Sequence, residues 1–173
     1  MHYSLDDAID ILERTPKVLS TLLKDLPEDW THSNEGENTW SPFDVVGHLI
    51  HGEKTDWVTR TKIILSKETK AFKPFDRFAQ FEESKGKNLT QLLEEFQTLR
   101  SENVKSLKDL DITSETLEWE GTHPELGKIT LRNLLSTWVA HDLGHIAQIS
   151  RVMAKQYTKE VGVWTQYLGI LQK

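Results

Sequence analysis

Apolar side chains recur at helical spacing in four long stretches of this 173-residue chain, at about residues 5–26, 41–65, 89–110 and 130–157. Positions three or four apart share one face of an α-helix, so each stretch carries an apolar stripe that must be buried. Strand signals are confined to short segments. Four such helices are stable when their apolar faces pack around a common core. The sequence therefore predicts an all-α protein built as a four-helix bundle.

Cap residues and prolines predict where these helices begin and bend. Ser41 followed by Pro42 is a typical helix start, and Thr130 caps the fourth helix in the same way. Pro16 lies inside the first stretch, where a straight helix would lose about 3 kcal/mol. A restart capped by Thr15 is the alternative, but the apolar spacing continues across Pro16 and favours a kink.

The segments between the helices are long and irregular. Residues 66–87 include a phenylalanine at every third position from Phe72 to Phe81, which predicts an ordered loop or a short helix. Residues 118–130 alternate and turn at glycine and proline, which predicts a loop or a small hairpin. A short helix is expected at residues 164–171. No repeat or linker divides the chain, so we expect one domain over residues 1–173 whose crossover loops permit departures from up-down-up-down order.

Charge and composition exclude several classes of protein. The chain has 21 Lys and Arg against 27 Asp and Glu, a net charge of -6, which argues against binding to nucleic acid or to anionic membranes. No apolar run reaches the roughly 18 to 20 residues that span a bilayer, and the first residues, MHYSLDDAID, do not form a signal sequence. A cytoplasmic protein is expected. Because cysteine is absent, any metal must be held by His, Asp or Glu.

Three histidines form a candidate metal site. His141 and His145 are four residues apart, so their rings project from one face of the fourth helix. His145 falls within the buried arc of that helix and His141 at its edge. A buried imidazole without a partner costs about 1 to 3 kcal/mol, and a shared cation would satisfy both rings. His48, beside the apolar stripe of the second helix, is the candidate third ligand.

The alternative for these histidines is three unconnected rings, each hydrogen-bonded in the core. We favour the metal site because two long helices carry all three rings on their inner edges. Three nitrogen ligands leave positions open for water or substrate, as in catalytic rather than structural metal sites. Zn, Ni, Mn, Co and Fe all accept imidazole ligands, and the sequence does not select among them.

Two acidic residues lie on apolar arcs and are candidate catalytic residues. Glu53 on the second helix and Asp142 on the fourth must be paired, hydrogen-bonded or protonated if they are buried. Asp142 suits either a structural pair with an arginine or backbone group, or an acceptor that orients a histidine ring. Either carboxylate would suit a general base. For Asp142, the structural pair and the acceptor that orients a ring have equal support from the sequence.

Other polar residues near these helices have weaker assignments. His51 projects about 60° away from His48, so we expect it behind the ligands or facing solvent. His123 is a candidate substrate contact, although a solvated loop histidine is the favoured interpretation. Arg77 is a candidate for binding an anionic group, although a salt bridge is favoured.

Two stretches of the sequence resemble the DinB-like superfamily of damage-inducible, YfiT-like four-helix bundles: WSPFDVVGHLIHGEKTDW and THPELGKITLRNLLSTWVAHDLGHIAQISRVMAKQY. The specific part is one histidine early in the second helix and HxxxH in the fourth, followed by Ala-Gln-Ile. The similarity extends over nearly the whole chain. It implies a divalent metal bound by His48, His141 and His145 at the open end of the bundle, often in a homodimer.

The resemblance also implies an activity. Relatives include thiol S-transferases that use bacillithiol or mycothiol, a thiol-dependent maleylpyruvate isomerase branch, and proteins described as metal-dependent hydrolases. For this chain it favours a metal-dependent thiol S-transferase acting on small electrophiles, with a low-molecular-weight thiol as cosubstrate. A metal-dependent hydrolase is one alternative. A noncatalytic metal-stabilised module for small-molecule binding or dimerisation is the other.

Overall fold

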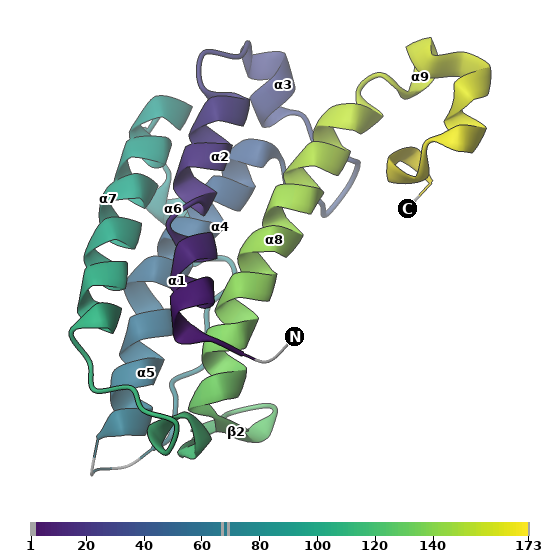
Figure 1. Cartoon of the computed structure of the whole chain (residues 1–173). Helices are drawn as coiled ribbons and strands as arrows, with labels where there is room; N and C mark the ends of the chain where they lie inside the picture. Colours follow the sequence, from purple (N-terminus) through teal and green to yellow (C-terminus); the bar gives the residue numbers. More distant parts are fainter. Residues whose placement is uncertain (1–2, 67, 69, 173) are drawn as a thin grey trace.

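The computed structural model describes residues 3–66, 68 and 70–172 and is dominated by helices (Figure 1). The α-helices of the described chain are α1 (Leu5–Leu12), α2 (Thr15–Leu23), α3 (Glu28–His32), α4 (Pro42–Thr55), α5 (Trp57–Leu65), α6 (Ala79–Glu83), α7 (Leu89–Lys108), α8 (Leu131–Lys155) and α9 (Thr158–Val161). The smaller elements are the 3-10 helices η1 (Thr116–Glu118), η2 (Gly162–Tyr167) and η3 (Gly169–Leu171) and the strands β1 (Glu120–His123) and β2 (Gly127–Thr130).

Four helical rods run side by side and form the predicted bundle (Figure 1). α1 and α2 make the first rod, α4 and α5 the second, α7 the third and α8 the fourth. The first rod packs against α7 and α8, and the second rod packs against the same two helices. Each of the first two rods therefore lies between the third and the fourth. This arrangement differs from a simple up-down-up-down bundle, in which rods adjacent in sequence are neighbours.

Two of the predicted helix starts carry reciprocal caps. The Ser41 amide donates to Asp44 Oδ2 at 2.9 Å, while Ser41 Oγ accepts from the Asp44 amide. Thr130 and Asn133 make the same pair of bonds at the start of α8. Each box satisfies two amides that the helix itself leaves without partners. The starts predicted for the second and fourth helices are thus confirmed.

Pro16 and Asp56 mark the two bends in the rods. Glu13 and Arg14 keep right-handed helical dihedrals before Pro16, so the first rod kinks as its apolar spacing predicts. At Asp56, φ is -111° and ψ is -77°, and the second rod breaks between α4 and α5. The prediction of one continuous helix over 41–65 is wrong there. Both halves keep apolar side chains toward the core, so the spacing alone does not register the break.

Two clusters of buried apolar side chains fill the bundle. One contains Trp57 and Trp138, whose stacked rings lie 5.6 Å apart, and joins α1, α5 and α8. The other surrounds Phe96 and joins α2, α4 and α7. α4 and α8 also pack directly against each other. This contact brings together the helix faces that carry His48 and His141.

A β-hairpin and the crossover before α7 close one end of the bundle. β1 and β2 pair in antiparallel register, which confirms a small hairpin within 118–130. The crossover joins the hairpin where the Phe72 amide donates to the Thr122 carbonyl at 2.9 Å. A Cβ at Gly121 would lie 2.6 Å from the Phe72 ring, so only glycine permits this approach. The crossover is the predicted ordered loop with a short helix, α6, although residues 67 and 69 lie outside the described chain.

The C-terminal segment differs from the prediction. Residues 164–171 form the 3-10 helices η2 and η3 instead of an α-helix. Gly162, with φ +57°, ends α9 and starts this segment in a conformation that other residues rarely adopt. Beyond the end of α8 the chain turns back, so that η3 contacts α8 (Figure 1). Within the described chain, none of the helices combines the length and apolar character needed to cross a bilayer.

Candidate metal centre

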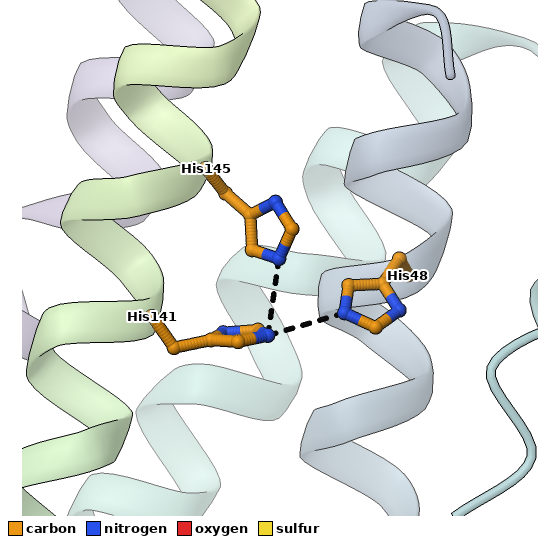
Figure 2. Close-up of side chains that lie close together, drawn as sticks. All are labelled: His48, His141 and His145. Atoms are coloured by element: carbon orange, nitrogen blue, oxygen red, sulfur yellow. Dashed lines mark hydrogen bonds between the residues drawn. The ribbon is translucent and has the colours of Figure 1, made fainter. Parts of the chain in front are cut away.

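The ring nitrogens of three histidines converge between α4 and α8. His48 is contributed by α4, and His141 and His145 by successive turns of α8. His141 Nε2 lies 3.1 Å from His48 Nε2 and 3.0 Å from His145 Nε2 (Figure 2). One ligand atom from each ring lies within 4.8 Å of the other two. The three residues chosen from the sequence are therefore brought together by the fold.

The spacing of these nitrogens fits one shared cation. A tetrahedral cation with metal–nitrogen distances of about 2.0 to 2.1 Å would hold its ligands roughly 3.3 Å apart. His145 Nδ1 donates to Gln148 Oε1 at 2.8 Å, so its Nε2 presents a lone pair to the centre. His48 Nε2 and His145 Nε2 both lie within hydrogen-bond distance of His141 Nε2. His141 Nε2 can form a good hydrogen bond with only one of them. A cation would accept the lone pairs of all three rings.

The environment keeps these rings neutral. Burial, together with the charges of the neighbouring histidines, lowers the pKa of His48 and of His141 to about 3. Burial also lowers the pKa of His145, although its hydrogen bond to Gln148 opposes this. Neutral imidazole is the form that binds metal. The Nδ1 atoms of His48 and His141 are buried without a partner in the described chain, so the polar contacts of these two rings are made by Nε2.

Aromatic side chains surround the three rings. Trp40, just before α4, lies 4.8 Å from the His48 ring centre, and Trp57 at the start of α5 lies 5.1 Å from that of His141. Phe75 from the crossover packs edge-on against His48 at 5.5 Å. These rings restrict the histidine rotamers and limit water around them. The sequence places Trp57 on the apolar stripe but gives no indication that the loop residues Trp40 and Phe75 reach the histidines.

The histidines open onto a cavity of about 430 Å³. Pockets for small molecules commonly have volumes of about 300 to 1,000 Å³. The cavity wall also carries Asp56, Arg60, Arg77 and His123. Its residues are drawn from α4, α5, α8, the crossover and the hairpin. A small molecule in this cavity would therefore contact the three histidines on one side and charged groups on the other.

Glu53 and Asp142 both bind Arg100 of α7. Arg100 Nη1 donates to Asp142 Oδ2 at 2.6 Å, and Arg100 Nη2 donates to Glu53 Oε1 at 2.7 Å. Asn103 Nδ2 donates to Glu53 Oε2 at 2.9 Å. All the carboxylate oxygens thus have partners, and both carboxyl groups are fully buried. These contacts favour the structural pair over a general base, which needs an oxygen facing the reacting molecule.

The structure decides between the alternatives given for His51 and for Arg77. His51 is 6% exposed and donates from Nδ1 to Glu83 Oε1 at 2.8 Å, so it does not face solvent. The salt bridge favoured for Arg77 is not formed with any side chain that the structure describes. Arg77 lines the cavity, as does His123, which is only partly exposed.

Asp56 and Arg60 are site residues that sequence reasoning misses. They form an ion pair four residues apart across the break between α4 and α5. Burial raises the pKa of Asp56 to about 6, although the Arg60 guanidinium opposes this shift. The signal in the sequence was the spacing of an acid four residues before a base, which usually marks an exposed helix face. The break turns this pair toward the cavity, and the sequence gives no cue for the break.

Comparisons with known proteins agree with this geometry. The family model of the DinB superfamily matches residues 11–149. A solved structure, YfiT from Bacillus subtilis, is similar at 27% sequence identity and a TM-score of 0.77, covering 90% of each chain. It is described as a "probable metal-dependent hydrolase with an unusual four-helix bundle topology". No curated protein matches the sequence. Because the family model spans most of the bundle and both helices that carry the histidines, this chain belongs to the DinB superfamily.

Proposed function

We propose that this protein is a metal-dependent enzyme that acts on a small molecule bound in the cavity. The observation that carries the proposal is the convergence of three Nε2 atoms, from His48, His141 and His145, at the wall of that cavity. Among the residues that the structure describes, the group of side chains placed to hold a metal consists of these three histidines. Three protein ligands with an open side are typical of catalytic sites, whereas structural sites are closed by a fourth.

The residues of the chain would hold and position the reacting groups. A bound divalent cation supplies positive charge that lowers the pKa of a nucleophile in its open position. Neutral imidazoles do not offset that charge, and Trp40, Trp57 and Phe75 shield the centre from bulk water. Glu53 and Asp142 would position the histidines without touching the reacting molecule. Both bind Arg100, and this connection fixes α4 against α8.

Two nucleophiles are compatible with this site. The description of the YfiT structure supports hydrolysis, in which the nucleophile is water. The resemblance of the sequence to thiol S-transferases supports a low-molecular-weight thiol. Because the chain has no cysteine, such a thiol would have to enter as a cosubstrate. Hydrolysis of a small substrate is the first candidate, and thiol transfer to a small electrophile is the second.

The proposal is tested by measuring metal content and turnover on the same preparations. Wild-type protein purified without added metal is expected to carry about one divalent ion per chain and to turn over members of a panel of esters, amides or thiol–electrophile pairs such as bacillithiol with monochlorobimane. His145→Ala should lose both the ion and the activity. The matched control is His32→Ala, which removes an exposed histidine outside the cavity.

The outcomes separate the candidate functions. Turnover without an added thiol supports hydrolysis, and turnover that requires the thiol supports transfer. A His145→Ala protein that loses the ion but keeps full activity would overturn the metal-dependent mechanism. Stoichiometric metal without turnover of any substrate would favour the noncatalytic binding module.

The family resemblance also supports a homodimer. Several large apolar side chains of the C-terminal segment are exposed in the single chain, including Val163 at 80% and Tyr167 at 73%. Clusters of exposed apolar side chains mark interaction surfaces in soluble proteins. We propose that a second copy of the chain covers this segment.

A further inference from the structure

The cavity wall contains one arginine whose charge is not offset by a protein carboxylate. Arg60 is paired with Asp56 and packs over the Phe72 ring, so its charge is already compensated. Arg77 lines the same cavity, is exposed, and forms no ion pair within the described part of the chain. It is close enough to His48 for its charge to lower the pKa of that ring. Arg77 is therefore a free guanidinium beside the candidate metal centre.

The hairpin provides a neutral donor on the same wall. His123 Nδ1 accepts hydrogen bonds from the amides of Glu125 and Leu126, both at 3.2 Å. A nitrogen that accepts from amides carries no proton, so the proton of the neutral ring is on Nε2. Burial lowers the pKa of His123, and nearby Arg60 lowers it further, which keeps the ring neutral. The turn thus fixes His123 as an Nε2–H donor at the cavity wall.

The charge of this wall contrasts with that of the whole chain. The protein has a net charge of -6, yet two arginines gather at the cavity. Asp56 offsets Arg60, so Arg77 and the carboxylate of Glu125 are the remaining charged groups of this wall, and both are exposed and screened by water. The three ligand histidines are neutral and contribute no negative charge. An anion in direct contact with Arg77 would meet its positive charge at close range, where screening is weakest, and a bound cation would increase the attraction.

We infer that Arg77 and His123 form a subsite for the carboxylate of an anionic small-molecule substrate whose reactive end lies at the three histidines. One uncompensated guanidinium and one neutral donor match the single charge and two oxygens of a carboxylate. A phosphate dianion would need more positive charge than this wall offers. Only the position of the reactive end depends on the proposed function, because in the described part of the chain Arg77 and His123 form no hydrogen bond with the metal ligands and can bind an anion without catalysis.

The test compares a carboxylate with its neutral isostere by ligand-observed ¹⁹F NMR. The probes are 4-fluorobenzoate and 4-fluorobenzamide, titrated against the full-length protein with EDTA and again with zinc. The EDTA series excludes direct binding of the carboxylate to the metal. Circular dichroism confirms that each protein stays folded. We expect the wild-type protein to bind the benzoate about tenfold more tightly than the benzamide in both series.

Three variants locate the binding energy. Arg77→Gln should weaken benzoate binding about tenfold, leave benzamide binding unchanged, and be partly rescued by Arg77→Lys. His123→Asn keeps an acceptor for the two turn amides, as asparagine does in Asx turns, but removes the Nε2 donor. It should weaken benzoate binding about threefold. Arg14→Gln, an identical change at an exposed arginine of the first rod, is the control and should have no effect.

The result separates this inference from the proposed function. Equal affinity of the wild-type protein for the two probes, or unchanged benzoate binding by Arg77→Gln in the EDTA series, would overturn the carboxylate subsite. Selective binding that disappears in Arg77→Gln supports the subsite even if the protein proves to bind no metal. Conversely, if the subsite is disproved, metal content and turnover still test whether the protein is a metal-dependent enzyme.

Discussion

Arg100 of α7 connects all four rods of the bundle. It is 1% exposed, and its guanidinium binds Glu53 on α4, Asp142 on α8 and the carbonyl of Leu12 on α1. The rings of Phe96 and Trp138 also pack against it. Asp142 is adjacent in sequence to His141, so the position of this ligand depends on the buried ion pairs. Arg100 is therefore a positioning residue for the candidate metal centre.

Replacing Arg100 is expected to destabilise the protein strongly. Arg100→Met keeps much of the side-chain volume but leaves two buried carboxylates without a countercharge, which should cost about 3 to 5 kcal/mol of the free energy of unfolding. Urea denaturation at pH 7 measures this loss. Arg132→Met is the matched control, because Arg132 forms an ion pair at the surface with Glu118, and it should cost less than about 1 kcal/mol. Equal losses in the two variants would contradict the role given to Arg100.

The sequence predicts the need for Arg100 but not its identity. Glu53 and Asp142 fall on apolar arcs, so a buried partner for each is expected. Arg100 is the partner of both. The chain has 21 basic residues, and spacing within one helix does not reveal which of them faces another helix. The available signal is that Arg100 lies four residues after Phe96 and four before Val104, which places it on the buried stripe of α7.

At the scale of an element, the loop between α3 and α4 is held in place by an ion pair with α8. Glu35 accepts two hydrogen bonds from Arg151, at 2.8 and 2.7 Å, and also pairs with Lys155. The same loop ends at Trp40, which packs against His48 and His145. The ion pair therefore supports one of the aromatic walls of the candidate metal centre.

Glu35→Gln should lower stability in a pH-dependent way. Hydrogen bonds from Arg151 hold the pKa of Glu35 down at about 2, against an ordinary value of 4.5. Because the folded-state pKa is lowered, the stabilisation is present above about pH 4.5 and is lost as the pH falls toward 2. We expect the variant to be less stable by about 1 kcal/mol at pH 7, after screening by solvent, and the difference to disappear near pH 2. Urea denaturation of both proteins across this pH range measures it.

Helix boundaries were predictable only where local chemistry sets them. Ser41 and Thr130 cap their helices through neighbours three residues away, so the sequence contains the whole signal. The break at Asp56 depends on packing against other parts of the fold, and the apolar spacing continues across it. The 3-10 turns that follow Gly162 form where the chain turns back and η3 packs against α8. Both errors therefore lie where packing against other parts of the fold sets the conformation.

At the scale of the whole molecule, the candidate metal centre joins residues that are 93 positions apart in the chain, His48 and His141. The helical pattern predicts that both face the core, and the family resemblance places them together. The cavity was not predictable in the same way. Its wall depends on Arg77 in the crossover and His123 in the hairpin, two loops whose paths are set by tertiary contacts such as that of Phe72 with Gly121.

The proposed homodimer gives a prediction for the molecule in solution. If a second copy covers the C-terminal segment, light scattering after size exclusion should give twice the chain mass. Changing Trp164, which is 66% exposed, and Tyr167 together to serine should shift the protein toward the monomer without changing its helical circular dichroism. A wild-type protein that is monomeric at high concentration would contradict the proposed surface.

The most direct test of the account is an anomalous diffraction map of zinc-loaded crystals, collected above and below the zinc absorption edge. We predict one zinc peak between α4 and α8, about 2.0 to 2.1 Å from the Nε2 atoms of His48, His141 and His145, with its remaining side toward the cavity. A fully loaded crystal with no peak among these three rings, or with zinc bound by other residues, would contradict the central claim.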